Sequence, residues 1–208
     1  MKFTPSILLA AALLAFATVS VKSQRASPAP EQRSLQLDES GHIVLAGHST
    51  AYLIRHLPVS SFPELPSGVV ELLNRRSCLI PQTYEAHRPE NVVHASLERT
   101  GSSDWAVLCS EQGTVSLLVF FGNAPAQFVV LASAPETVRL QVHDATGVLG
   151  FNWGIDPASP RQIHDAQIGL EHRPPLMDHD ALADSVVDQR TIYHFYAKSA
   201  WTLVDLPN

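Results

Sequence analysis

The sequence predicts an α+β fold that is mainly antiparallel β-sheet, arranged as a meander, with one clear helix near residues 67–76. Two patterns indicate the sheet. Apolar and polar residues alternate from Val93 to Glu98, as in a strand with one buried face. Residues 114–121 are rich in β-branched and aromatic side chains, which favour strands. Strand pairing is therefore expected to dominate the fold.

The helix is indicated by its two ends and by the spacing between them. Pro66 stands directly before it, and Ser67 is expected to be the capping residue. Apolar residues then recur at helical spacing over the next two turns. Arg75 and Arg76 close the segment, where positive side chains suit the negative end of the helix dipole.

Further strands are expected wherever short apolar or β-branched runs lie between turn residues. These runs are residues 42–46, 51–56, 105–109, 128–131, 138–142, 191–196 and 201–206. Tyr193 and Phe195 are expected to share one strand face, with Trp201 across the hairpin from it. Residues 144–176 contain several prolines and glycines and are expected to be irregular.

Residues 1–23 have the pattern of a cleavable signal peptide. A positive residue, Lys2, precedes an apolar run that is too short to span a bilayer comfortably. Cleavage is expected after Ala17 or Ser23, and the alternative is an uncleaved N-terminal anchor. The sequence therefore predicts a secreted or periplasmic protein, with a flexible lead-in over residues 24–41 and a single globular β-rich domain over residues 42–208.

The predicted mature chain is acidic. The whole chain has a formal net charge of -6, and removal of residues 1–23 takes away two lysines and no acid, which leaves 12 basic and 20 acidic residues and a charge of -8. Nucleic acids and anionic membrane surfaces bind basic patches, so neither is expected as a partner. No later stretch is long and apolar enough to span a membrane. The expected partner is an unidentified extracytoplasmic protein or ligand.

The chain has two cysteines, Cys78 and Cys109. In an oxidising compartment two such residues are expected to form a disulfide. The alternative is a reactive thiol pair. Their spacing is not that of a Cys-x-x-Cys motif, and no histidine or lysine directly flanks either residue, so the disulfide is favoured.

Three aspartates stand close together before the last predicted hairpin. Asp178, Asp180 and Asp184 are expected to lie in a turn, where alternate carboxylates of a tight loop can hold Ca²⁺. Ala181 occupies the position where calcium loops usually have glycine. The alternative is that these are solvated turn residues that cap backbone amides, with no metal.

This acidic segment has a counterpart earlier in the chain. Glu98-Arg-Thr-Gly-Ser-Ser-Asp104-Trp-Ala-Val107 and Asp178-His-Asp-Ala-Leu-Ala-Asp184-Ser-Val-Val187 follow one template of acids and apolar residues. Both copies resemble the FG-GAP blade motif of integrin-type β-propellers, in which an acidic turn leads into a strand. The stretches Cys78-Leu-Ile-Pro-Gln82 and Asp104-Trp-Ala-Val-Leu-Cys109 resemble a group of uncharacterised exported bacterial proteins, a resemblance that implies no specific activity.

No recognised catalytic motif is present. The chain lacks His-Glu-x-x-His, Gly-x-Ser-x-Gly and the glycine-rich loops that bind phosphates or dinucleotides. The first functional hypothesis is therefore a non-enzymatic module that binds a partner or ligand. The alternative is a metal-assisted hydrolase that uses histidines and aspartates within residues 143–184, which requires His143, His164 and the aspartates at 178–184 to converge in one pocket.

Overall fold

The structure is a computed structural model that describes residues 37–122 and 128–207. These residues all belong to one compact unit, Arg33–Asn208. The predicted signal peptide, its cleavage sites and most of the lead-in lie outside the described residues. Within the part that is described, neither helix has the length and hydropathy that a membrane crossing would need.

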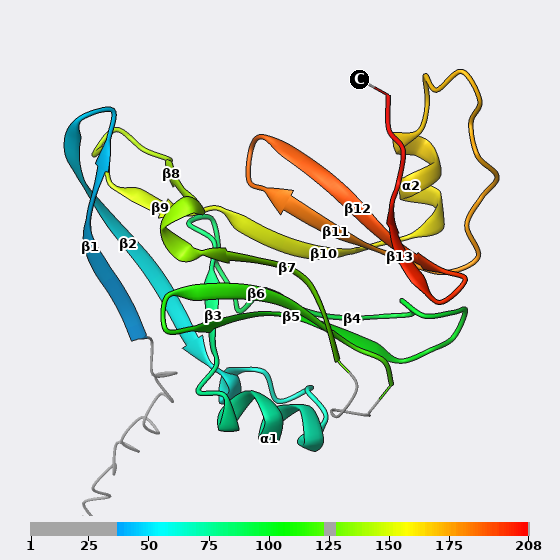
Figure 1. Cartoon of the computed structure of the whole chain (residues 1–208), viewed down its shortest axis with the longest axis horizontal. Helices are drawn as coiled ribbons and strands as arrows, with labels where there is room; N and C mark the ends of the chain where they lie inside the picture. The colour runs from blue at the N-terminus through cyan, green and yellow to red at the C-terminus, as the bar shows by residue number, and fades with distance from the viewer. Residues whose placement is uncertain (1–36, 123–127, 208) are drawn as a thin grey trace, which may run out of the picture. The chain divides into compact units, whose positions relative to one another are not determined.

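The larger sheet has nine strands, in the order β7-β6-β5-β3-β2-β9-β8, with β1 paired to β2 and β4 paired to β5 (Figure 1). The strands are β1 Leu37–Leu45, β2 His48–Pro58, β3 Leu79–Gln82, β4 Val92–Ala95, β5 Asp104–Glu111, β6 Thr114–Phe120, β7 Phe128–Pro135, β8 Leu140–Val142 and β9 Leu149–Phe151. Its pairs are antiparallel except for β2 with β9, which run parallel. The sheet is therefore mixed.

The smaller sheet has four antiparallel strands in the order β10-β11-β12-β13. They are β10 Trp153–Ala158, β11 Ala181–Val186, β12 Arg190–Ala197 and β13 Ala200–Leu203. The chain passes from the larger sheet to the smaller one at Asn152, the one residue between β9 and β10. The expected turn between β12 and β13 is present, with positive φ angles at Lys198 and Ser199.

The predicted helix is confirmed as α1, Ser67–Arg75, which is followed by Arg76 as the C-cap. The expected cap is wrong, because Pro66 is the N-cap residue and no side chain caps the helix. Short 3₁₀ segments, η1 Val59–Ser61 and η2 Glu136–Val138, precede α1 and follow β7.

Three further expectations differ from the structure. Strand β1 begins at Leu37, so the last residues of the expected lead-in belong to the folded domain. Residues 144–176 are not irregular throughout, because they contain strands β9 and β10 and a second helix, α2 Pro160–Ala166. Ser159 and Gln162 form a capping box at the start of α2, with proline at its first turn. That signal was present in the sequence.

Three apolar clusters show that the elements are layered. One lies between α1 and the larger sheet and includes Leu73, Val107 and Phe120. A second lies between the two sheets and includes Leu108 and Trp153. A third lies between α2 and the smaller sheet. Successive residues of β5 alternate between the first two clusters because strand side chains alternate between faces.

The final hairpin corrects one aromatic contact. Tyr193 and Phe195 do share a face, and both pack against the cluster beside α2. Trp201 is paired with Tyr196, on the opposite face of β12, and packs into the cluster between the sheets. The expected position of Trp201 across from Tyr193 and Phe195 is therefore wrong by one residue of register, which reverses the face.

The cysteine pair is at disulfide distance. Cys78 and Cys109 form an S–S bond with a Cα–Cα distance of 5.4 Å. Cys78 directly precedes β3 and Cys109 lies on β5, so the bond links the two strands beside their single paired position, Leu79 with Ser110. Both cysteines are buried in the cluster beneath α1.

Candidate functional site: a polar groove beside the smaller sheet

The three aspartates predicted to bind calcium are not brought together. Asp184 lies inside strand β11, where its carboxylate accepts hydrogen bonds from Trp153 Nε1 at 2.7 Å and His194 Nε2 at 3.1 Å. Asp178 is hydrogen-bonded to its neighbour His179. Among the described residues, no group of three donor atoms suitable for a metal includes these aspartates. A turn with three converging carboxylates is therefore not present at Asp178–Asp184.

The two segments that share the acidic template contact each other. The backbone of Ser96 pairs with Asp180, whose Oδ2 accepts from Ser96 N at 3.1 Å and whose N–H donates to Ser96 O at 3.0 Å. Thr100 Oγ1 donates to the carbonyl of Asp178 at 2.6 Å. Asp180 thus joins its own acidic segment to Ser96, which follows β4 and lies just before the other acidic segment. This role of Asp180 is structural.

The histidines of the hydrolase alternative also lie apart. His143 stacks on Tyr84 with 4.6 Å between ring centroids, beside a pocket of about 290 Å³. His164 lies on α2, where its carbonyl accepts from Arg173. None of the described pockets is lined by both histidines or by the aspartates at 178–184. The convergence that this alternative requires is not found.

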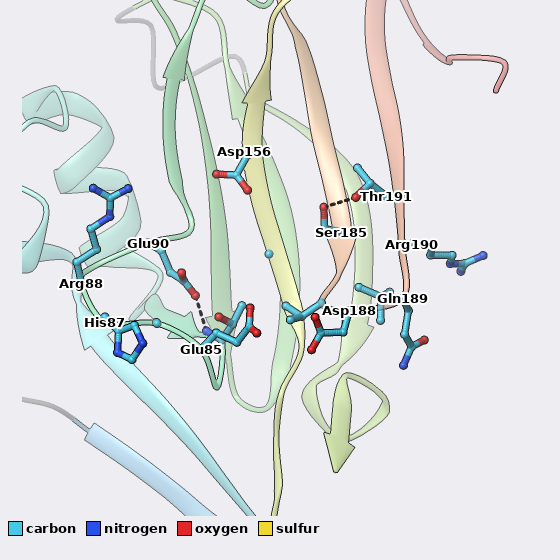
Figure 2. A pocket seen from close by; sticks show the side chains of 15 residues that line it. Glu85, His87, Arg88, Glu90, Asp156, Ser185, Asp188, Gln189, Arg190 and Thr191 are labelled. Atoms are coloured by element: carbon cyan, nitrogen blue, oxygen red, sulfur yellow. Dashed lines mark hydrogen bonds between the residues drawn. The ribbon is translucent and has the colours of Figure 1, made fainter. Parts of the chain in front are cut away.

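A larger groove lies between the loop that follows β3 and the smaller sheet (Figure 2). Its volume is about 860 Å³. One wall is the loop from Thr83 to Glu90, and the other is the turn that joins β11 and β12. Gly154 and Asp156 of β10 lie between these walls. The groove is open to solvent and lies on the face of the smaller sheet that also carries α2.

The loop wall is fixed by partly buried hydrogen bonds, most of them to strands of the larger sheet. Arg55 of β2 donates to the carbonyls of Thr83 at 3.0 Å and Ala86 at 2.7 Å. The Gln82 side chain pairs with both backbone groups of Glu90, and the Glu90 carboxylate accepts from Thr83 N at 2.7 Å. Because the loop is bonded at both ends, its exposed side chains are presented from a defined backbone.

Asn91 joins this loop to the edge of β10. It has a positive φ of 69° and is almost fully buried. Its amide accepts from Ile155 N at 3.1 Å and donates to the carbonyls of Trp153 at 3.2 Å and Pro81 at 2.7 Å. The Asn91 side chain therefore takes the place of a neighbouring strand beside β10, and it holds the loop and the smaller sheet together at the groove.

The charges that line the groove are largely unpaired. Four acids and two arginines line it, so its formal charge is negative when His87 is neutral. Within the described chain, the side chains of Glu85, Asp156, Arg88 and Arg190 make no hydrogen bond or ion pair. In Figure 2, Glu85 and Arg88 lie on the loop side, Arg190 lies on the hairpin side, and Asp156 lies between them. These exposed charges are available to a ligand.

The groove also carries neutral hydrogen-bonding groups. The hydroxyls of Ser185 and Thr191 are hydrogen-bonded to each other at 2.9 Å on its floor. Beside the β11–β12 turn, Tyr84 donates to Asp188 Oδ2 at 2.9 Å, and Gln141 donates to the Tyr84 hydroxyl at 3.2 Å. Burial, the hydrogen bond to Asp188 and the negative charge of that carboxylate raise the pKa of Tyr84 to about 12. Tyr84 therefore stays neutral at physiological pH and fixes Asp188.

Asp156 is the groove carboxylate with the most unfavourable surroundings. Although the side chain is exposed, neighbouring groups partly desolvate its carboxylate, which raises its pKa above the ordinary 3.8; the negative charge of Glu90 raises it further, and Arg88 opposes these effects. The ionised carboxylate therefore has a higher free energy, relative to its protonated form, in the folded protein than in the unfolded chain. A positively charged ligand would relieve this penalty.

This raised pKa predicts a pH-dependent effect of Asp156→Asn. The penalty for the ionised carboxylate is present above its folded pKa and disappears below its unfolded pKa, so it is removed by the substitution only at the higher pH. We expect Asp156→Asn to raise the free energy of unfolding at neutral pH, by less than about 1 kcal/mol because the side chain is exposed. Near about pH 3 the variant and the wild type should be equally stable. Urea unfolding at both pH values measures this, and a destabilised variant at neutral pH would contradict it.

Sequence reasoning did not identify this groove. Its residues come from the loop after β3, from β10 and from the β11–β12 turn, which are far apart in the chain. The one available signal was the cluster of charged residues in Glu85-Ala-His-Arg-Pro-Glu90.

A scan against models of protein families, a search of curated proteins and a search of solved structures returned no match. The resemblances to FG-GAP turns and to exported bacterial proteins therefore stay predictions.

Proposed function

We propose that the protein is an exported binding module, without catalytic activity of its own, that holds a positively charged segment of a peptide or protein in the groove beside the smaller sheet. The observation that carries this proposal is the set of unpaired carboxylates in an open groove of about 860 Å³. Export is supported by the signal-like residues 1–23 and by the cysteine pair at disulfide distance.

The charge of the ligand is argued from the groove itself. Glu85, Asp156 and Asp188 place negative charge along it, while Arg88 and Arg190 lie on opposite sides. A lysine or arginine side chain between them would meet carboxylates and the hydroxyls of Ser185 and Thr191. An acidic surface also accelerates the approach of a cationic partner by long-range attraction.

The shape of the groove favours a segment of chain over a small molecule. Sites for small molecules usually enclose most of the ligand in a largely apolar cavity. This groove is open and is lined mainly by polar and charged side chains. The hydrolase alternative is less well supported, because His143 and His164 do not converge with the aspartates that it requires.

Removal of two groove carboxylates should weaken binding of a cationic peptide. The test uses a short, capped, lysine-rich peptide as the probe and isothermal titration calorimetry at low salt. We expect the double variant Glu85→Gln and Asp156→Asn to raise the dissociation constant about tenfold or more, which corresponds to about 1.4 kcal/mol. Added salt should weaken binding to the wild type, because exposed charges are screened.

The matched control is the double variant Glu64→Gln and Asp205→Asn. It removes the same number of charges from exposed residues that line none of the described pockets. The control should bind the peptide almost as well as the wild type. Equal weakening in both double variants would show that net charge alone attracts the peptide, and the groove would not be the binding site.

A further inference from the structure

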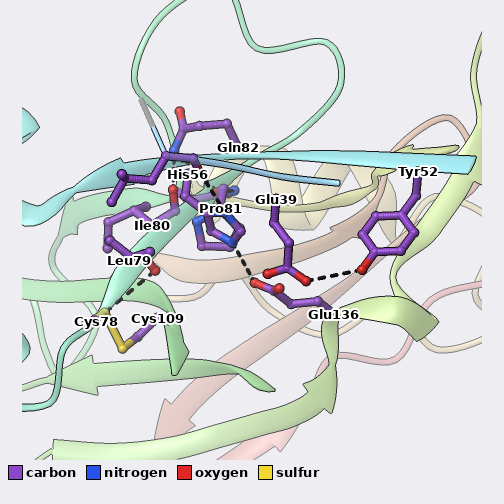
Figure 3. A network of polar contacts seen from close by, with 12 residues as sticks. Glu39, Tyr52, His56, Cys78, Leu79, Ile80, Pro81, Gln82, Cys109 and Glu136 are labelled. Carbon is purple, nitrogen blue, oxygen red and sulfur yellow. Dashed lines mark hydrogen bonds and ion pairs between the residues drawn. A yellow bond between two sulfur atoms is a disulfide. The ribbon is translucent and has the colours of Figure 1, made fainter. Parts of the chain in front are cut away.

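A second cluster of polar side chains lies where the strands β1 and β2 meet η2 (Figure 3). Its members are Glu39 of β1, His56 of β2 and Glu136 of η2. One ligand atom from each residue lies within 4.8 Å of the other two. This is the one such group of histidine, cysteine and carboxylate side chains among the described residues.

Strand pairing explains why Glu39 and His56 share a face. In the antiparallel β1–β2 pair, Leu37 is opposite His56 and Glu39 is opposite Ile54. Alternate residues of a strand point to the same side, so Glu39 is the diagonal neighbour of His56. Glu136 is brought to the same place by the end of β7, where its N–H donates to the carbonyl of Gly113 at 2.9 Å.

The two ring nitrogens of His56 have different partners. Nδ1 lies 3.1 Å from the carbonyl oxygen of Leu37, and Nε2 lies 2.8 Å from Glu136 Oε1. A carbonyl oxygen only accepts hydrogen bonds, so Nδ1 carries the proton and donates it. Histidines that bind metals typically donate one ring N–H to a carbonyl or carboxylate in this way, which orients the other nitrogen toward the metal.

Glu136 is the unusual member of the cluster. It is 1% exposed, and its second oxygen, Oε2, is buried with no hydrogen-bond partner. Its other oxygen, Oε1, lies 2.8 Å from His56 Nε2. A buried carboxylate oxygen without a hydrogen-bond partner is costly. It indicates that a further positively charged group completes this site.

Glu39 is held in place by Tyr52. The Tyr52 hydroxyl is hydrogen-bonded to Glu39 Oε1 at 3.2 Å. Gly41 is directly opposite Tyr52, and a Cβ atom at this position would lie 2.8 Å from the tyrosine ring. The absence of a side chain at Gly41 lets the ring lie across the strand and reach Glu39. Glu39 itself is exposed, so the site is open to solvent on this side.

From these contacts we propose that Glu39, His56 and Glu136 form a Zn²⁺ site. Zinc is bound in proteins by histidine nitrogen and by carboxylate oxygen, and a site with three protein ligands leaves a fourth position for water. Two carboxylates balance the charge of the ion. The imidazole ligand disfavours Ca²⁺ and Mg²⁺, which prefer oxygen ligands. On binding, Zn²⁺ would replace the direct contact between His56 Nε2 and Glu136 Oε1.

The zinc site would connect the β1–β2 hairpin to the segment after β7. It is separate from the groove of the proposed function, since none of its three residues lines that groove. In zinc sites of about tetrahedral geometry, neighbouring ligand atoms are roughly 3.3 Å apart, given metal–ligand bonds of about 2.0 Å. His56 Nε2 and Glu136 Oε1 are closer than this, so a small side-chain movement would accompany binding.

The test is titration of the full chain with ZnCl₂ after removal of metals by a chelator. We expect one equivalent to bind with micromolar or tighter affinity and to raise the melting temperature. Glu39→Gln should weaken binding at least tenfold, while it keeps an acceptor for Tyr52 and stays folded because residue 39 is exposed. Glu64→Gln is the control for loss of one exposed carboxylate and should bind zinc as the wild type does.

A second variant tests the buried ligand. His56→Gln should abolish stoichiometric zinc binding, and its circular dichroism spectrum reports whether it is folded. If this variant fails to fold, the Glu39→Gln result still decides the matter. Zinc affinity unchanged in Glu39→Gln, or no stoichiometric binding by the wild type at micromolar zinc, would overturn the proposal and leave His56 and Glu136 as a buried ion pair only.

Discussion

Replacement of both cysteines, Cys78→Ala together with Cys109→Ala, is expected to lower the free energy of unfolding by about 3–4 kcal/mol. The bond closes a loop with a sequence separation of 31 residues, which restricts the unfolded chain far more than the folded one. The two strands that it links, β3 and β5, pair at a single position. Few backbone hydrogen bonds would therefore still hold these two strands together once the disulfide is lost. Urea unfolding at equilibrium measures the loss.

The contribution of the cross-link is separated from packing by a second comparison. Both cysteines are buried, so their replacement by alanine also removes contacts beneath α1. Reduction of the wild type by a thiol removes the bond and leaves both side chains in place. The reduced wild type should therefore retain slightly more stability than the double variant. If reduction costs less than about 1 kcal/mol, the loop is not restrained by this bond as proposed.

The substitution Asp104→Ala should cost about 3–5 kcal/mol of folding stability. Asp104 is fully buried at the start of β5. One carboxylate oxygen accepts from Leu97 N at 2.8 Å and Glu98 N at 2.7 Å, and the other accepts from Gly122 N at 2.8 Å. Ser102 Oγ is a further donor. The alanine variant leaves these backbone N–H groups without a partner, and each such group carries a desolvation penalty.

Asp104→Asn and Asp180→Ala are the informative comparisons. Asparagine keeps one acceptor oxygen at nearly the same volume, so Asp104→Asn should lose less stability than the alanine variant. Asp180 occupies a corresponding acidic segment but is only half-buried and accepts from one backbone N–H, that of Ser96. Its replacement by alanine should cost about 1 kcal/mol. Equal losses at residues 104 and 180, measured by urea unfolding, would contradict the role assigned to Asp104.

Asp104 and Asp184 occupy the same position in a shared sequence pattern, but their hydrogen-bond partners in the structure differ in kind. The template places both acids six residues after another acid and ahead of an apolar pair. In the structure both are buried, and both accept hydrogen bonds from protein groups. Asp104 ends a loop by binding backbone amides, whereas Asp184 lies within a strand and binds the side chains of Trp153 and His194. The shared pattern therefore did not show that both acids are buried acceptors of hydrogen bonds from protein groups.

The local elements were predictable because their causes are local. Helix α1 follows from apolar residues at helical spacing after Pro66, and the β5–β6 hairpin follows from two β-rich runs around a glycine turn at Gly113. The cysteine pair followed from composition and compartment. Between residues 144 and 176, short strands and a seven-residue helix were hidden by prolines and glycines, although the capping box at Ser159 marked the helix.

By itself, the sequence determined a β-rich chain with one clear helix near residues 67–76, one cysteine pair, an acidic charge and a signal-like N-terminus. Only the tertiary structure decided which polar residues meet. Glu39, His56 and Glu136 come from three separate elements, whereas Glu85 comes from the loop after β3 and Asp156 from β10. The physical reason is that sequence periodicity fixes which face of a strand a side chain occupies, whereas the neighbours of that face depend on long-range strand pairing and layering.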